Sequence, residues 1–226
     1  MKVKHKVIHY VRIGSVHLSR YTDMNIPPDL LRDYGAVVKN YHRHDDIFRE
    51  RQVAFYYFQI LTGLVKMVNH GEEHDFIQGV FTDGESFGEP PMIGEFPYPA
   101  SAIAISDTQL LALPRKHFIE LLRGHFDIHL HFTMHMCQRV QQKSEILKAL
   151  NLGQPEERIL AAIDLLKSKL SRDQYGQDNH FVVPVTRQEL GDMTGLRVET
   201  VIRKVGLLEE QGKLQIAERK ILRAYD

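Results

Sequence analysis

Residues 186–212, TRQELGDMTGLRVETVIRKVGLLEEQG, decide the fold of this chain, because they predict two helices joined by a sharp turn. Thr186 and Glu189 have the spacing of a capping box, in which each side chain accepts a hydrogen bond from the other residue's backbone amide. Gly195 can supply the positive φ that a tight turn needs. We expect the second helix to run from about residue 197 to 210 and to stop at Gly212.

The second of these helices has an apolar face and a polar face. Val198, Val201, Val205 and Leu208 recur at three- and four-residue spacing, so they share one buried stripe. Such a helix fits the major groove of DNA, where side chains near its N-terminus reach base edges, and Arg203 can donate two hydrogen bonds to guanine. We expect DNA contacts from Thr186, Arg187, Gln188, Arg197, Glu199, Thr200, Arg203, Lys204, Arg219 and Lys220.

Two short strands are expected after the helix pair. Residues 214–217 and 221–223 flank Glu218-Arg219-Lys220, an arrangement typical of a β-wing with a basic tip. Helix-turn-helix periodicity is common in proteins, so one alternative is a helical pair with a hairpin that has no contact with DNA.

Composition restricts the class of protein. The chain has 226 residues, enough for two small domains, and its 29 basic and 29 acidic side chains leave no formal net charge. A neutral chain contacts DNA only through local patches. The single cysteine, Cys137, excludes a disulfide framework and a four-cysteine iron–sulfur cluster. No apolar run is long enough to span a membrane, so we expect a cytoplasmic protein with no membrane partner.

From about residue 35 to 118 the sequence has short apolar strands separated by turns. We expect strands near residues 36–38, 47–48, 55–61, 64–68, 76–81, 101–106 and 109–113. Residues 7–13 are compatible with another. Strands this short and regularly spaced predict an antiparallel roll. The segment FGEPPMI, residues 87–93, interrupts them, and its glycine and following short helix could bring backbone N–H groups close to a ligand.

A long helix is expected from about residue 126 to 151. Apolar or small side chains recur along it at alternating steps of four and three, which is the heptad pattern of a coiled coil. The alternative is a helix that packs only on its own domain. The pattern predicts that two chains pair along Phe126, Leu130, Thr133, Cys137, Val140, Ser144 and Leu147.

Histidine pairs on and beside this helix raise the question of a metal. His125 with His129 and His131 with His135 are each four residues apart, which can place two imidazoles on one ion. With 13 histidines in the chain such pairs arise by chance, and no third ligand is evident. We therefore expect no metal or heme site.

The order of a β-roll, a heptad helix and a winged helix-turn-helix resembles the Crp/Fnr family of bacterial transcription regulators. The resemblance covers about residues 35–223 and depends on Gly63, Asp83-Gly84-Glu85, Phe87-Gly88-Glu89, Glu156-Glu157-Arg158, TRQELG at 186–191 and VETVIR at 198–203. It implies an α+β fold in three parts. These are a cyclic-nucleotide-binding-like antiparallel β-roll (jelly roll) as sensor domain at 1–125, a dimerisation helix at 126–151 and a winged helix-turn-helix DNA-binding domain at 152–226.

The departures from the family concern the ligand. In members that bind cyclic AMP, an arginine before a Ser-Ala pair neutralises the cyclic phosphate, and here that position is Ala100. A Thr-Ser pair that contacts adenine is replaced by Lys143-Ser144. A buried phosphate without a cation is costly, so cyclic AMP is doubtful and any effector should be a different small molecule. The resemblance implies effector contacts from Gly88, Glu89, Ser101, Lys143 and Ser144.

The expected function is therefore sequence-specific DNA binding by a homodimer at a palindromic promoter site, with RNA polymerase as a further partner. No catalytic residue is expected, because the chain has no P-loop, no HExxH motif and no Ser/His/Asp set in one motif. An alternative is a ligand-binding regulatory module that acts through a protein partner. A DNA shift that persists after removal of residues 1 to 152 would reject this alternative.

Overall fold

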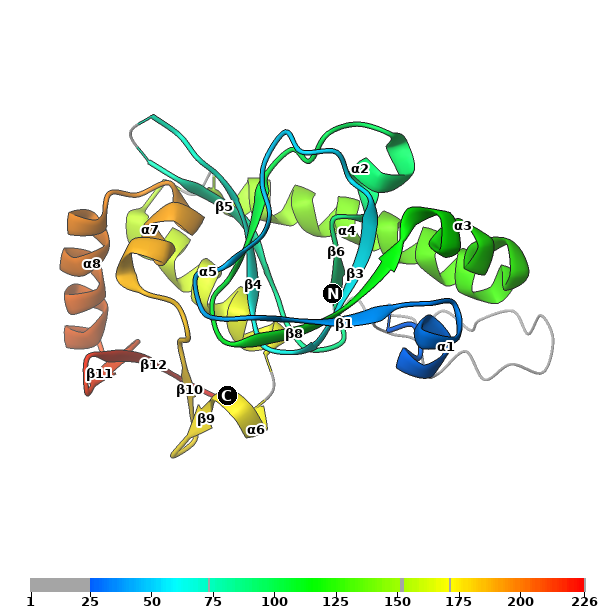
Figure 1. Ribbon diagram of the computed structural model, residues 1–226. Coiled ribbons are helices and arrows are strands. Elements are labelled where there is room, and N and C mark those ends of the chain that lie inside the picture. Colours follow the sequence, from blue (N-terminus) through cyan, green and yellow to red (C-terminus); the bar gives the residue numbers. More distant parts are fainter. Residues whose placement is uncertain (1–24, 73, 151–152, 171, 226) are drawn as a thin grey trace, which may run out of the picture.

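The computed structural model describes residues 25–72, 74–150, 153–170 and 172–225 of the chain (Figure 1). The strand considered at residues 7–13 lies outside the described residues. Within them, no helix is both long and apolar enough to cross a membrane.

The N-terminal part is an antiparallel β-roll, as the sequence predicts. Its strands are β1 (Val37–Tyr41), β2 (Asp46–Phe48), β3 (Tyr56–Thr62), β4 (Val65–Asn69), β5 (Phe76–Phe81), β6 (Ser86–Phe87), β7 (Ser101–Ala104) and β8 (Thr108–Pro114). They form two four-stranded sheets, with the orders β1-β8-β3-β6 and β2-β7-β4-β5. Both sheets contribute buried apolar side chains to one hydrophobic core.

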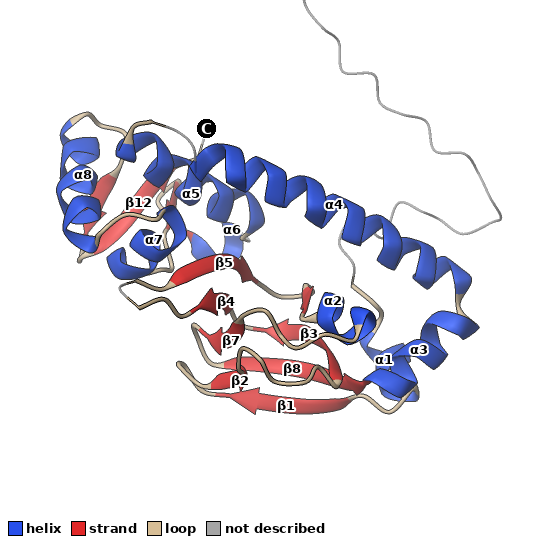
Figure 2. Ribbon diagram, turned by 90° about the horizontal axis from the view of Figure 1, so that it is seen from above, coloured by secondary structure: helices blue, strands red, loops and turns tan. Residues whose placement is uncertain are grey.

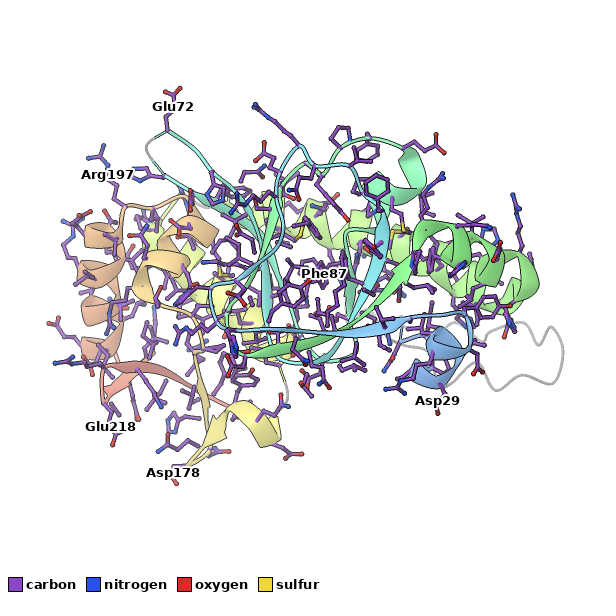
Figure 3. All side chains as sticks on the ribbon, viewed as in Figure 1. Asp29, Glu72, Phe87, Asp178, Arg197 and Glu218 are labelled. Carbon is purple, nitrogen blue, oxygen red and sulfur yellow. The ribbon has the colours of Figure 1, made fainter. Side chains whose placement is uncertain are left out.

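Aromatic side chains fill the centre of this roll. Phe87 is fully buried there (Figure 3) and stacks on Phe58, with ring centroids 5.5 Å apart. The turn after β3 requires glycine, because Gly63 has φ of 112° and a Cβ atom at this position would lie 2.5 Å from the Thr108 hydroxyl oxygen. The glycine at position 63 therefore has a local steric cause.

Four helices belong to this half of the chain: α1 (Pro28–Asp33), α2 (Glu89–Gly94), α3 (Arg115–Gly124) and α4 (Phe126–Leu150). The sequence analysis did not predict α3, whose Phe118, Leu121 and Leu122 are buried in the core of the roll. The long helix α4 begins at Phe126 as predicted and lies across one side of the roll, reaching from α3 towards the C-terminal part (Figure 2).

The C-terminal part is a winged helix-turn-helix. Its elements are α5 (Pro155–Lys169), α6 (Arg172–Tyr175), β9 (Gly176–Gln177), β10 (His180–Val182), α7 (Arg187–Thr194), α8 (Val198–Glu210), β11 (Gln215–Ala217) and β12 (Lys220–Ala224). The four strands pair antiparallel in the order β11-β12-β10-β9. No helix or strand was expected from the sequence at residues 172–177, which are mostly polar. Within that stretch the structure has α6 and β9, which are too short and too polar to show hydrophobic periodicity.

The two parts of the chain pack closely against each other. Helix α7 contacts strand β5 (Figure 1), and one apolar cluster combines Leu64, Val68 and Val80 of the roll with Leu190 of α7. At this junction the Lys66 ammonium lies 2.8 Å from the Glu189 carboxylate, with only 16% and 8% of the two side chains exposed. Glu189 of the capping box therefore also ties the helix-turn-helix to the roll.

Replacing Lys66 by methionine measures how much the protein depends on this buried ion pair for its stability. The change removes the cation and leaves Glu189 buried without it, so we expect the free energy of unfolding in urea at neutral pH to fall by about 3–5 kcal/mol. Lys213→Met, at an exposed position, is the matched control and should change it by less than about 0.5 kcal/mol.

The effect of Lys66→Met should also depend on pH. Burial raises the pKa of Glu189, but hydrogen bonds from Lys66 and Thr186 outweigh burial and lower it below its usual range. The stabilisation from this group is thus fully present above the ordinary carboxyl pKa and is lost as the pH falls through the lowered pKa. The gap between native chain and variant should narrow in that acidic range. A gap that stays constant would mean that the pair contributes through packing alone.

Candidate nucleic-acid interface and effector pocket

The helix-turn-helix starts at a complete capping box. The Thr186 hydroxyl accepts a hydrogen bond from the Glu189 amide at 3.1 Å, and the Glu189 carboxylate accepts one from the Thr186 amide at 2.8 Å. Gly195 ends α7 in the left-handed region with φ of 65°, and Gly212 follows α8 with φ of 69°. These features confirm the predicted boundaries of both helices.

Helix α8 presents a polar face to solvent. Of the predicted stripe, Val201, Val205 and Leu208 are fully buried and Val198, at the start of the helix, is only half-buried. The side opposite the stripe therefore faces outward. Glu199 and Arg203, one helical turn apart, are both exposed. Arg197 occupies the N-cap position and points away from the protein (Figure 3). The structure therefore leaves the N-terminal half of α8 open to a partner.

The wing lies beside the start of α7. Glu218 and Arg219 form its tip with positive φ of 49° and 65°, and Glu218 extends into solvent there (Figure 3). The Arg187 guanidinium donates a hydrogen bond to the Arg219 carbonyl at 3.0 Å, which ties the wing tip to α7. Arg219 and Lys220 are exposed. Arg219, Lys220 and the N-terminal half of α8 therefore lie in the same C-terminal winged helix-turn-helix.

Besides Arg187, which is half-buried and bonds the Arg219 carbonyl, three other predicted DNA contacts are less accessible than expected. Gln188 is exposed but donates to Asp192 at 2.8 Å, and Thr200 is half-buried. Lys204 differs most from its expected role as a DNA contact, because its ammonium lies 2.6 Å from the carboxylate of Glu156 in the first turn of α5. The hydrogen bond from Lys204 lowers the pKa of Glu156. Lys204 therefore holds α8 to α5 in this structure.

The predicted dimer residues form a stripe along α4 that the described residues of the protomer leave exposed. The side chains facing the roll are others, such as the buried Ile128 and Phe132. Thr133 and Ser144 bond the carbonyls of residues 129 and 140 on their own helix. Every member of the predicted seam is exposed. The exposed fractions of its large apolar residues are 76% for Phe126, 42% for Leu130, 68% for Val140 and 61% for Leu147.

The structure brings together only part of the predicted effector set. Gly88 and Lys143 line a cavity of about 530 Å³ between the roll, α2 and α4, and the buried Glu89 follows Gly88 at the start of α2. Ser101 and Ser144 do not line it. The Ser101 hydroxyl instead accepts a hydrogen bond from the Glu50 amide at 3.0 Å, on a different depression of the surface.

An arginine that the sequence analysis did not select sits at the centre of this region. The Arg139 guanidinium of α4 lies 2.8 Å from the carboxylate of Glu89, and it also donates to the Ser86 carbonyl. Burial, together with the negative charge of Glu89, raises the pKa of Tyr57 and of Tyr98, so both phenols remain neutral. The ion pair links α4 to α2. The feature of the sequence that could have identified Arg139 is its position four residues before Lys143, on the same helix face.

A second lysine joins the cavity to the DNA-binding part. The Lys169 ammonium of α5 donates to the Val80 carbonyl at 2.8 Å and lies 3.0 Å from the Glu85 carboxylate of the roll. The ion pairs of Lys169, Lys66 and Glu156 could not be predicted from the sequence, because each pairs with a residue distant in the chain. As to metals, no three side chains of the His, Cys, Asp or Glu type gather into a possible ion site among the described residues.

Comparison with known proteins agrees with this architecture. A cyclic nucleotide-binding domain matches residues 38–125, and a Crp-like helix-turn-helix domain matches residues 157–224. The chain is 26% identical to the transcriptional activator protein FnrA of Stutzerimonas stutzeri over 207 residues, which cover 90% of this chain and 81% of that protein. It is 29% identical to the cyclic AMP receptor protein of Thermus thermophilus over 133 residues, 59% of this chain and 58% of that protein.

Solved structures share the fold. FixK2 from Bradyrhizobium japonicum superposes with a TM-score of 0.71 over 84% of this chain and 93% of that one, at 21% identity. A match over this share of both chains means that the two proteins share the overall fold.

Proposed function

The chain belongs to the Crp/Fnr family of transcription regulators, and from this membership we propose that it acts as a homodimer that binds a palindromic promoter site. The observation that carries the proposal is the exposed polar face of α8. Glu199 and Arg203 project from it on the side opposite the buried stripe. An arginine there can read guanine, and a glutamate can read cytosine.

The uncovered seam on α4 supports the homodimer. A row of exposed apolar side chains along one helix is an unfavourable surface for an isolated protomer, and pairing with a second copy would bury it. A parallel pair would place two α8 helices on the same side of the assembly. Two-fold symmetry in the protein then requires two-fold symmetry in the DNA site.

The family membership also supports the remaining parts of the proposal. A transcription regulator of this kind acts on RNA polymerase, and we place the protein in the cytoplasm, where bacterial DNA is found. The roll would hold a small-molecule effector in the cavity beside α4. No catalytic activity is proposed.

Cyclic AMP should bind weakly or not at all. Ala100, at the position of the phosphate-binding arginine, is fully buried, and Ser101 bonds Glu50 instead of facing the cavity. A buried phosphate would have no dedicated cation there. Titration calorimetry of the native chain with cyclic AMP should give no saturable heat at micromolar concentrations. Micromolar or tighter binding would refute this prediction.

Binding to genomic DNA tests the function itself. The full chain is incubated with sheared DNA from its source organism, and the retained fragments are sequenced. We expect enrichment of a limited set of fragments upstream of genes, and much less enrichment with Arg203→Ala. Retained fragments that match the input in composition would argue against a sequence-specific regulator.

A further inference from the structure

The cavity beside α4 has walls that are mostly apolar. Its lining includes Phe81 of β5, Ile93 of α2, Phe96, and Phe132 and Met136 of α4. A volume of about 530 Å³ is in the range that holds a small organic ligand. Walls of this kind favour a ligand whose bulk is hydrocarbon or aromatic rings.

The charges around the cavity leave one excess cation. Arg139 is paired with Glu89, and Lys169 is paired with Glu85. Lys143 lines the same cavity from α4, and its ammonium has no hydrogen-bond or ion-pair partner among the described residues. A ligand with a single negative charge would neutralise the charge of Lys143. A second negative charge would face only cations that are already paired.

Few polar groups remain to satisfy a polar ligand. Apart from the charged side chains, the cavity wall contributes the amides of Gln78 and Gln142, and Gln78 already donates to Asn69 at 2.5 Å. A ligand with many hydroxyl groups would therefore leave most of them unpaired, which costs about 1–3 kcal/mol for each buried group.

Together these observations lead us to propose that the effector is an apolar monoanion, such as a medium-chain or aromatic carboxylic acid. Its anionic head binds Lys143, and its apolar body fills the space between α2, β5 and α4. This inference rests on the proposed function, because it specifies the effector of the regulator. It also links the ligand to dimer formation, since Val140 both lines the cavity and lies on the exposed seam.

The test uses a matched pair of fluorescent probes on the native full chain. Anilinonaphthalene sulfonate is an apolar monoanion, and N-phenylnaphthylamine has the same ring system without the charge. We expect the sulfonate to bind about ten-fold more tightly, as one charge-assisted hydrogen bond allows. Decanoate should displace it at lower concentration than decanol.

Variants locate the binding to this cavity. Lys143→Gln should abolish the preference for the anionic probe, whereas Lys148→Gln, on the same helix but away from the cavity wall, should keep it. Ile93→Asp adds a negative charge to the cavity wall and should weaken the sulfonate more than the neutral probe. Ile202→Asp adds the same charge to the exposed face of α8 and should change neither.

Each other result overturns the proposal. Equal affinity for both probes would reject the anionic class of ligand. So would a result in which neither probe binds. A preference that survives Lys143→Gln would reject the site. Binding of the native chain to genomic DNA fragments is measured separately from probe binding. The proposed effector class can therefore be rejected while DNA binding is retained, and DNA binding can be rejected while the probe result holds.

Discussion

Replacing Val140 and Leu147 together by aspartate should convert a dimer into a monomer. Both side chains are exposed in the protomer, 68% and 61%, and lie on the predicted seam of α4. Pairing would bury two carboxylates from each chain without partners, and one unpaired buried charge costs about 3–5 kcal/mol. The dissociation constant of the dimer should therefore rise by at least about two orders of magnitude. Sedimentation velocity across a range of concentrations measures it.

The control for this variant is Gln138→Asp, which adds a carboxylate to an exposed position of α4 that is off the seam. It should remain as dimeric as the native chain. Because Val140 also lines the effector cavity, Leu147→Asp alone separates loss of pairing from damage to the cavity. A dimeric double variant would show that α4 is not the interface.

Replacing Arg203 by alanine should remove recognition at one base pair in each half-site. The guanidinium is exposed on α8 and can donate two parallel hydrogen bonds to guanine. We expect a loss of about 1–3 kcal/mol per contact, or roughly 5- to 150-fold in affinity, together with a relaxed preference at that pair alone. Fluorescence anisotropy on a selected duplex and on single-base substitutions of it gives both quantities.

Arg197→Ala is the comparison for Arg203→Ala. Arg197 is exposed at the N-cap of α8, so we expect it to contact phosphate and not a base. Its loss should weaken binding to all sequences alike and reduce the dependence of log K on log salt concentration. Lys204 is unsuited to this purpose because its ion pair with Glu156 mixes folding with binding. An unchanged base preference in Arg203→Ala would remove Arg203 from base recognition.

The sequence predicted the elements whose stability is local. The capping box at Thr186, the turn at Gly195, the buried stripe of α8 and the start of α4 all depend on residues within one or two turns of each other, and the structure confirms them. The strands of the roll were also found, because turns bound them and their apolar residues alternate. Helix α3 was not predicted, because it has only ten residues and follows strand β8 directly.

The sequence could not predict contacts between distant residues. Nothing near Glu89 in the chain indicates Arg139, and nothing near Glu189 indicates Lys66, since these partners are 50 and 123 residues away. The packing of α7 on β5 could not be predicted from the sequence either, because it joins residues of two separately expected domains in one apolar cluster. The resemblance placed Ser101 and Ser144 at the ligand, but the structure turns Ser101 to Glu50 and leaves Ser144 exposed, so the pocket differs from the family's pattern.

Selection of binding sites from a pool of random duplex DNA tests the central claim most directly. The native full chain is bound to the pool, retained duplexes are amplified and the cycle is repeated until the sequences converge. A symmetric dimer predicts a palindrome whose half-sites lie about one helical turn apart, each with a G·C pair whose selection requires Arg203. Recovered duplexes that converge on no sequence, or on one without two-fold symmetry, would contradict the account.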